Sequence, residues 1–337
     1  MGEKSILILG SKHIAALEVI YSREFSELGI RNQVLGIQDK FLKYYNKSLI
    51  NKVIYRIGFS RIINEIQSDI KVVINKFQPT IVLIFKGMEI EPRTLKWIKT
   101  KGILILNYNP DNPFLFTGRG SGNRNVTNSI RLYDLYITYN QSVVSELFKK
   151  GVESRTIPFA YDCGGFVFEE IKKDEEINKL CFLGNCDKFR KKFIVSLSKK
   201  GIPVDVYGEN WKSLKSQENI TVYGPKYGDD FWKTLQRYSV QLNLLRPHNL
   251  NSHNMRSFDI LGAGGIMVAP KSLEHELFFL NFKGVRLFAD FNEAIIEINK
   301  ILNMSFEERI SLRRNTRMKV MREHTYRHRV EMLLSMI

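Results

Sequence analysis

Cysteine is scarce in this sequence, and the residue pattern of a metal site is missing from it. The three cysteines, Cys163, Cys181 and Cys186, are odd in number and lack the paired spacing of a disulfide framework or a zinc site. No Asp-x-Asp motif occurs, and no histidines and cysteines cluster with ligand spacing. These absences argue against a disulfide-stabilised secreted domain, and we expect neither a bound metal nor a cofactor.

Long apolar runs are absent as well. No stretch has the length needed to cross a bilayer, and Lys4 is followed by an apolar run, residues 5–9, that is only as long as a strand. We therefore expect neither a transmembrane helix nor a signal peptide, and we predict a cytoplasmic protein.

Acidic residues are too few to balance the basic ones. The 337 residues carry 51 Lys and Arg against 35 Asp and Glu, a net charge of +16. Residues 1–168 hold 23 basic and 14 acidic residues and residues 169–337 hold 28 and 21, so both halves are positive. Nucleotide diphosphates, lipid phosphates, an anionic membrane and nucleic acid are all compatible partners, and charge alone does not choose among them.

Apolar runs of strand length alternate with amphipathic segments of helix length through the first half of the chain. This alternation is typical of a doubly wound parallel sheet. Gly10 stands alone after the first run, so the further glycines of a dinucleotide-binding loop are missing. Ser11 is a candidate N-cap for a helix that runs to about Leu28. The predicted strands are residues 5–10, 33–37, 80–85, 103–107, 135–138 and 155–159.

Ligands bind beyond the carboxyl ends of the strands in such sheets, which directs attention to three turns. These are residues 11–13, 86–89 and 107–113, and the last is followed by a Gly/Arg loop at residues 118–124. His13 and Asp111 are candidate general bases, although His13 is also typical of a helix start. Arg119 and Arg124 could bind an anionic acceptor, and the competing interpretation of their loop is an ordinary surface loop.

A second alternation of the same kind begins after a charged, non-periodic stretch at residues 163–178, which we interpret as an interdomain linker. The predicted strands are residues 180–183, 204–207, 220–223 and 240–244. Two final helices are predicted to begin near residues 293 and 306. The chain therefore contains two α/β domains of similar plan.

The most informative stretch is residues 254–270, in which a polar helix start is followed by glycines and a short apolar strand. A helix N-terminus with Arg256 suits a phosphate, and Asp259 could accept hydrogen bonds from ribose hydroxyls. Gly264 and Gly265 either let the backbone approach a ligand or end the helix. Asn254 and Ser257 either contact the ligand or cap the helix.

This stretch resembles the nucleotide-sugar motif of CgeB-like glycosyltransferases, in which Asn-x-Arg-x-Phe and an acidic residue precede a glycine-rich turn. Here the motif is Asn254, Arg256, Phe258 and Asp259. The resemblance extends over about residues 180–334 and includes the segments 182–184, 206–208 and 324–330. It implies a GT-B fold, with two Rossmann-like parallel-sheet domains, a cleft between them and a C-terminal helix that crosses back.

The resemblance also implies how the chain is divided. Residues 1–162 would form an acceptor-binding domain, residues 163–178 the linker and residues 179–322 the nucleotide-sugar domain, with residues 323–337 returning to the first domain. Arg190, Arg246 and Arg256, with the backbone of Gly184, would bind the diphosphate without a metal. Tyr207, Gly208 and Trp211 would bind the base and ribose together with Asp259, and Trp211 would stack on the base or pack beneath it.

A basic amphipathic stretch at residues 42–63 interleaves tyrosines and aliphatic residues with lysines and arginines. Such a segment can lie on an anionic membrane, at the inner face of the cell membrane. In the competing interpretation it is a domain-surface helix whose apolar stripe faces the core.

We predict from these features a glycosyltransferase of the hexosyltransferase type, dependent on a nucleotide-sugar and independent of metal. Its acceptor would be a glycan, a lipid-linked glycan or a cell-surface polysaccharide. One alternative is a non-catalytic GT-B scaffold that binds glycans or a partner. The other is a basic nucleic-acid-binding protein, but no recognised binding module is present and nucleic acid is not the expected partner.

Overall fold

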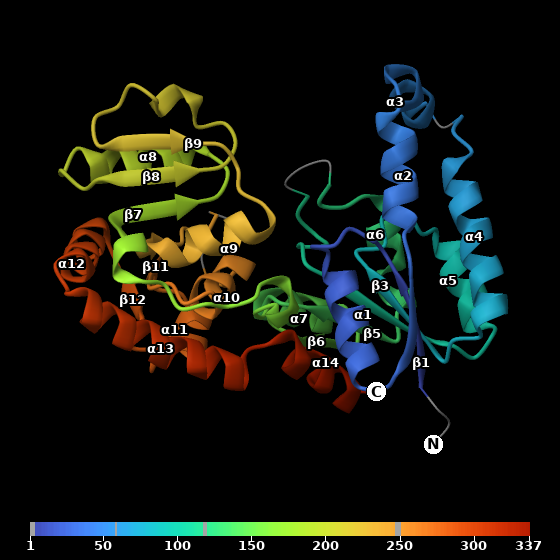
Figure 1. Ribbon diagram of the computed structural model, residues 1–337. Helices are drawn as coiled ribbons and strands as arrows, with labels where there is room; N and C mark the ends of the chain where they lie inside the picture. Colours follow the sequence, from blue (N-terminus) through green and yellow to red (C-terminus); the bar gives the residue numbers. More distant parts are fainter. Residues whose placement is uncertain (1–3, 58, 117–119, 247–250) are drawn as a thin grey trace. The chain divides into compact units, whose positions relative to one another are not determined.

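The structure, a computed structural model, describes residues 4–57, 59–116, 120–246 and 251–337. The chain forms two compact units (Figure 1). Met1–Pro158 and Val330–Ile337 make the N-terminal unit, and Phe159–Arg329 makes the C-terminal unit. The chain thus passes between units after Pro158 and again after Arg329, and residues 163–178 lie wholly within the C-terminal unit.

The N-terminal unit is built on a parallel six-stranded sheet with the order β2-β1-β3-β4-β5-β6. Ile6 is paired with Asn32 on one side and with Ile81 on the other. β1 and β3 are buried along their whole length, which explains why they consist of apolar residues without alternation. The strands are β1 Ser5–Leu9, β2 Arg31–Leu35, β3 Ile81–Phe85, β4 Leu104–Asn109, β5 Leu135–Thr138 and β6 Ser154–Thr156.

Helices cover this sheet, and their apolar faces complete its core. Ile66, Ile70 and Ile74 of α4 recur every four residues and pack with Leu7 and Val82 of the sheet. The helices are α1 Leu17–Glu27, α2 Ile37–Asn46, α3 Leu49–Arg56, α4 Ile62–Phe77, α5 Pro92–Lys99, α6 Arg124–Ser129 and α7 Gln141–Lys149, with a 3-10 turn at Ile130–Leu132. α14, Tyr326–Ser335, ends in this unit.

The first helix begins later than predicted. Ser11 does not cap it, because α1 starts at Leu17 after a turn, and the residue at its N-cap is Ala16. The buried carboxylate of Glu18 instead reaches back and accepts a hydrogen bond from the backbone N–H of Ser11 at 2.9 Å. This contact holds residues 11–16 as a loop at the carboxyl end of β1.

The C-terminal unit contains a second parallel six-stranded sheet, with the order β12-β11-β10-β7-β8-β9. Its last strand, Val285–Phe288, is absent from the prediction, and Tyr238–Leu242 begins two residues earlier than predicted. The strands are β7 Ile177–Leu183, β8 Val204–Tyr207, β9 Ile220–Tyr223, β10 Tyr238–Leu242, β11 Met267–Pro270 and β12 Val285–Phe288. The two sheets confirm the predicted pair of doubly wound domains.

Helices and a buried ion network complete this unit. Glu176 accepts hydrogen bonds from Arg309 at 2.5 Å and pairs with Arg313 at 2.9 Å, which attaches the segment before β7 to α13. The helices are α8 Lys188–Ser198, α9 Gly228–Arg237, α10 Met255–Gly262, α11 Leu273–Phe279, α12 Phe291–Leu302 and α13 Phe306–Glu323. Short 3-10 turns lie at Cys163–Gly165, Lys173–Glu175 and Lys212–Leu214.

Candidate functional site

The strand order of each sheet reverses at one point, which is where doubly wound sheets bind ligands. In the C-terminal unit this switch point lies between β7 and β10, because β8 and β9 extend the sheet one way and β11 and β12 the other. In the N-terminal unit it lies between β1 and β3. Each switch point brings together turns that the sequence had marked separately.

Arg190 connects the two strand ends at the C-terminal switch point. Its guanidinium donates to the carbonyl of Leu244, just beyond β10, at 2.9 Å, and to that of Asn185, just beyond β7, at 3.2 Å. The helix that carries it is capped by Asp187, whose side chain accepts from the Arg190 backbone N–H at 2.9 Å. Arg190 therefore holds its position through protein contacts before any ligand arrives.

Three arginines that the sequence analysis selected for phosphate binding gather at this edge. Burial is the main cause that lowers the pKa of Arg190, and the negative charge of Asp187 opposes it. The positive charges of Arg246 and Arg256 lower the pKa further. Arg246 is exposed, four residues beyond the end of β10. Guanidinium groups that are close enough to repel one another form a region of positive potential that an anion would stabilise.

The start of α10 beside these arginines is held by a capping network. The Asn254 side chain accepts from the Ser257 backbone N–H at 3.0 Å, and Ser257 is fully buried. Asn243, which the sequence analysis overlooked, exchanges amide hydrogen bonds with Asn254 and donates to the Ser257 hydroxyl at 3.0 Å. Asn254 and Ser257 therefore act as cap residues here, which was one of the two predicted roles.

Arg256 and Asp259 form an ion pair along one face of α10. Their side chains approach to 3.3 Å, and the Arg256 guanidinium lies 4.2 Å from the centre of the Phe231 ring. The exposed fractions of the two side chains are 24% and 10%. Burial raises the pKa of Asp259 to about 7, and the charge of Arg256 opposes this rise. Asp259 consequently titrates near neutral pH, beside a guanidinium that remains partly accessible.

Three of the predicted base-binding and motif residues are buried. Trp211 is 1% exposed and its indole N–H donates to the carbonyl of Gly184 at 2.8 Å, so it packs beneath the strand end and offers no face to a base. Phe258 is fully buried in a cluster of aromatic rings. The Tyr223 ring stacks on the Tyr207 ring, with 4.6 Å between the ring centres. Tyr223, which the prediction did not include, is the more exposed of the stacked pair.

The glycines divide into two groups. Gly208 has φ +140°, and a Cβ there would lie 2.4 Å from the carbonyl oxygen of Gly184, so the turns after β7 and β8 approach each other through bare backbone. Gly264 and Gly265 are buried, and a Cβ on Gly265 would lie 2.7 Å from the carbonyl oxygen of Leu235. They end α10 against protein atoms, which was one of the two predicted roles.

A buried histidine and carboxylate network, also overlooked, supports the segment before α10. Glu274 accepts from the hydroxyl of Ser252 at 2.6 Å and lies 2.5 Å from Nδ1 of His253. Nε2 of His253 accepts from the backbone N–H of Phe159 at 3.1 Å, so the ring proton is on Nδ1. His275 lies 2.9 Å from the Ser257 hydroxyl, and burial lowers its pKa to about 4. Isolated polar residues in a loop carry no sequence signal for such a network.

Carboxylates and lysines dominate the N-terminal switch point. Lys86, after β3, pairs with Asp111, after β4, at 2.6 Å. Glu89 is buried nearby, and burial raises its pKa to about 7, while its own backbone N–H and the charge of Lys86 act in the opposite direction. The Asn107 amide donates to the Lys86 carbonyl at 3.3 Å. Asp111 is thus placed at the predicted edge and is held by a cation.

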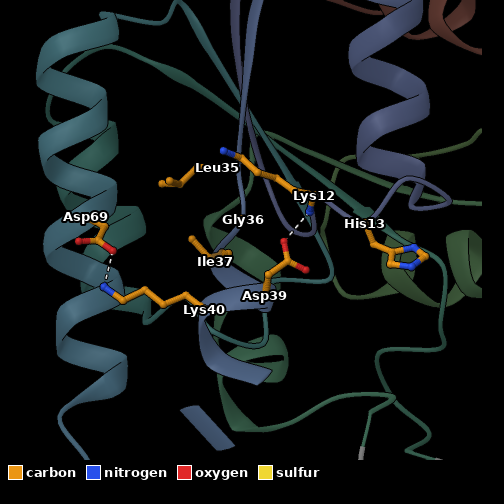
Figure 2. Close-up of a pocket in the computed structure, with 8 residues that line it drawn as sticks. All are labelled: Lys12, His13, Leu35, Gly36, Ile37, Asp39, Lys40 and Asp69. Atoms are coloured by element: carbon orange, nitrogen blue, oxygen red, sulfur yellow. Dashed lines mark hydrogen bonds and ion pairs between the residues drawn. The ribbon is translucent and has the colours of Figure 1, made fainter. Parts of the chain in front are cut away.

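A cavity of about 510 Å³ opens beside the β1 and β2 ends (Figure 2). Asp39 accepts from the backbone N–H of Lys12 at 2.6 Å, and Lys40 pairs with Asp69 at 2.5 Å across the cavity. His13 is exposed at its rim, and its Nδ1 accepts from the Ala15 N–H at 3.3 Å, as in a helix-start turn. The lining residues are Lys12, His13, Leu35, Gly36, Ile37, Asp39, Lys40 and Asp69.

The two predicted acceptor arginines have different outcomes. Arg119 lies outside the described residues. Arg124 is exposed at the first position of α6, whose N-cap is Asn123. The side-chain amides of Asn123 and Asn125 both donate to the carbonyl of Met88, at 2.8 and 2.9 Å. The start of α6 is therefore attached to the turn after β3, on the same edge as Lys86 and Asp111.

Solved structures that match this chain over both of its doubly wound units show that its fold is GT-B. Sucrose-phosphate synthase (tll1590) from Thermosynechococcus elongatus matches with a TM-score of 0.68 at 10% identity, covering 99% of this chain and 98% of that one. Anabaena Alr3699/HepE in complex with UDP matches with a TM-score of 0.63 at 9% identity, covering 99% of each chain. A candidate UDP-N-acetylglucosamine 2-epimerase from Listeria monocytogenes matches with a TM-score of 0.61 at 9% identity, covering 98% of this chain and 95% of that one.

A family match covers the C-terminal part of the sequence. Residues 190–335 match the family described as Glycosyl transferase-like, and this confirms the resemblance inferred from the motif around Asn254. A comparison with curated protein sequences finds no match. The chain therefore has a GT-B fold, and its residues 190–335 match the glycosyl transferase-like family.

Proposed function

We propose that this protein transfers a hexosyl group from a nucleotide-diphosphate sugar, and that the C-terminal unit binds the donor. The observation that carries the proposal is the grouping of Arg190, Arg246 and Arg256 at the β7–β10 switch point. Positioned guanidinium groups bind phosphate oxygens as planar forks. In this proposal Asp259 accepts a hydrogen bond from a ribose hydroxyl. Binding of UDP by the structurally similar HepE supports a uridine nucleotide as the first donor to test.

The chemistry follows from where charge develops. Transfer breaks the bond between the anomeric carbon and the diphosphate oxygen, so negative charge grows on the leaving diphosphate. Arginines already fixed in position stabilise this charge without reorganising during the reaction. Arg190 fits this role because its contacts with Leu244 and Asn185 hold it in place. In this proposal the guanidinium groups provide the stabilisation that a metal supplies in other transferases.

We assign the acceptor to the N-terminal unit, where the switch point holds carboxylates. An inverting reaction needs a base to take the proton of the attacking hydroxyl, and Asp111 and His13 are the candidates. Asp111 is the better supported of the two because Lys86 holds its carboxylate at the strand ends. Arg124 on the same edge would contact an anionic group of the acceptor. Glycans, lipid-linked glycans and cell-surface polysaccharides are the acceptor classes proposed, in a protein acting at the inner face of the cell membrane.

The donor proposal is tested by nucleotide binding to matched charge variants. Arg246→Ala removes an exposed cation at the proposed site, and Lys200→Ala removes an exposed cation just beyond α8. Wild type and Lys200→Ala should be stabilised alike by one of UDP, GDP, CDP or ADP, by about 2.7 kcal/mol at a hundredfold excess over Kd. Arg246→Ala should bind at least tenfold more weakly. Equal binding by both variants would remove the site from the switch point.

Transfer itself needs a separate assay with the nucleotide-sugar identified in that screen. Release of the nucleoside diphosphate that depends on an added acceptor supports the transferase. Tight donor binding with neither transfer nor hydrolysis would favour the non-catalytic scaffold. Binding to oligonucleotides that weakens steeply with salt, in the absence of nucleotide-sugar binding, would favour the nucleic-acid alternative.

A further inference from the structure

The second and third helices of the N-terminal unit carry apolar side chains that face away from the protein. Leu49, Val53 and Ile57 recur at intervals of four, so they share one face of α3, with Ile50 beside them. Leu49 is 79% exposed and α3 contains no buried residue at all. In the competing sequence interpretation this stripe faces the core, and the structure overturns that interpretation for α3.

The opposite faces of these helices explain how the apolar stripe can remain uncovered. The ring of Tyr55 in α3 packs edge-on against two rings of α2. Its centre lies 4.9 Å from that of Phe41 and 5.7 Å from that of Tyr45. These aromatic contacts join α2 and α3 without using the aliphatic residues of α3. Figure 1 shows α3 at the tip of α2, at the end of that helix farther from the sheet. The pair therefore presents an apolar surface, residues 49–57, at an outer end of its unit.

The charge around this surface has a single sign. Residues 40–64 contain six Lys and Arg and no Asp or Glu. Lys43, Lys47 and Arg56 are exposed, whereas Lys40 is already paired with Asp69. Lys52 lies 5.5 Å from the centre of the Tyr45 ring. An aliphatic face with a rim of exposed positive charge matches the boundary between acyl chains and phosphates in an anionic bilayer.

We propose that α2 and α3 dock this protein on an anionic lipid bilayer. The aliphatic face of α3 enters the headgroup region, while Lys43, Lys47 and Arg56 contact lipid phosphates. The surface binds from one side, since among the described residues no helix is long and apolar enough to cross the membrane. A protein partner of mixed charge would leave some of the positive charges at the rim without a negative partner, whereas anionic lipid phosphates would neutralise all of them. The observations therefore favour lipid. The proposal does not depend on the transferase activity.

The experiment is sedimentation of the full chain with vesicles of phosphatidylcholine, with or without phosphatidylglycerol. Wild type should bind the anionic vesicles and lose binding in high salt. Ile50→Asn with Val53→Asn removes apolar contact, and Lys43→Gln with Lys47→Gln removes charge. Each pair should weaken binding by about tenfold or more, since both terms contribute to interfacial binding. Because these side chains are exposed, both variants should keep the wild-type melting temperature.

Exposed residues of α4 provide the matched controls. Val72→Asn and Lys76→Gln remove an exposed apolar group and an exposed charge outside the surface, and both should sediment like wild type. Equal binding to neutral and anionic vesicles, no binding at all, or unchanged binding by the α3 variants would each overturn the proposal. A wild-type dimer in ultracentrifugation that the α3 variants dissociate, without vesicle binding, would show a second copy as the occupant.

Discussion

The two switch points have the same topology and opposite chemistry. In the C-terminal unit, guanidinium groups gather beside the strand ends, and the charges of Arg246 and Arg256 help to lower the pKa of Arg190. In the N-terminal unit, buried carboxyl groups gather instead, and burial raises the pKa of Glu89 to about 7. A parallel sheet determines where a site lies, but the side chains that follow each strand determine which charge the site accepts.

This difference fits two substrates of different charge. A diphosphate brings negative charge and is matched by arginines, whereas the hydroxyl of an acceptor is neutral and must lose a proton. A carboxylate held by a lysine, as Asp111 is by Lys86, can accept that proton. The comparison therefore predicts that variants of the two switch points affect separate measurements.

The largest effect is expected at the N-terminal switch point, on the rate of transfer. Asp111→Asn should lower kcat by about a hundredfold or more, because positioned general bases contribute 10²–10⁴-fold. The nucleotide Kd should not change, since we propose that the donor binds to the C-terminal unit. Steady-state transfer and calorimetric nucleotide titration measure the two quantities. His13→Gln is the comparison variant, and a loss of rate in it alone would move the base to His13. Full rates in both variants would contradict an inverting mechanism with either base.

The second prediction concerns how stability depends on pH through Asp259. Its pKa rises from 3.8 in the unfolded chain to about 7 in the folded one, so the folded state binds the proton more tightly. Between about pH 4 and 7 the free energy of unfolding should therefore fall as pH rises, relative to Asp259→Asn, which has no such proton. The change should amount to a few kcal/mol at most, at about 1.4 kcal/mol per pKa unit. Urea unfolding of both proteins across this range measures it, and parallel curves would contradict the buried carboxyl.

At the C-terminal switch point, Arg256→Ala should weaken nucleotide-diphosphate binding by roughly 1.5–3 kcal/mol, the range for a hydrogen bond to a charged group. Arg256→Lys keeps the charge but loses the planar fork, and should recover only part of the affinity. Calorimetry with the preferred nucleotide measures both. A folded Arg256→Ala protein with wild-type affinity would exclude this residue from the site. Transfer at saturating donor should change less than affinity does.

The smallest effect is expected at the cap of α10. Asn254→Ala removes the acceptor for the Ser257 N–H and should lower the free energy of unfolding by about 1 kcal/mol. Asn254→Asp keeps an acceptor and should retain most of that stability. Thermal unfolding without ligand compares the two variants with wild type. A loss of nucleotide affinity in Asn254→Asp at full stability would show that Asn254 also contacts the donor.

Much of the fold was predictable from the sequence because buried parallel strands have a strong local signature. The apolar runs of β1 and β3 were found this way, and so was the motif at α10. The short strand Val285–Phe288 was missed, since only two of its four residues are buried and its pattern is weak. For the site, the structure places Arg190, Arg246 and Asp111 beyond the carboxyl ends of β7, β10 and β4, and their contact with a ligand stays a prediction. Trp211, which could stack on the base or pack beneath it, and the motif residue Phe258 are both buried in the core.

The sequence by itself determined the alternation of strands and helices, the positive charge and the family match of residues 190–335, because each depends on local residue patterns. Only the tertiary structure decided which side chains are covered. Aromatic residues next to a binding motif satisfy the same pattern whether they face a base or the core, and burial placed Trp211 in the core. Likewise, the spacing of Leu49, Val53 and Ile57 puts them on one face of a helix, but nothing in that spacing states what lies against it. The packing of Tyr55 on Phe41 turned that face outward.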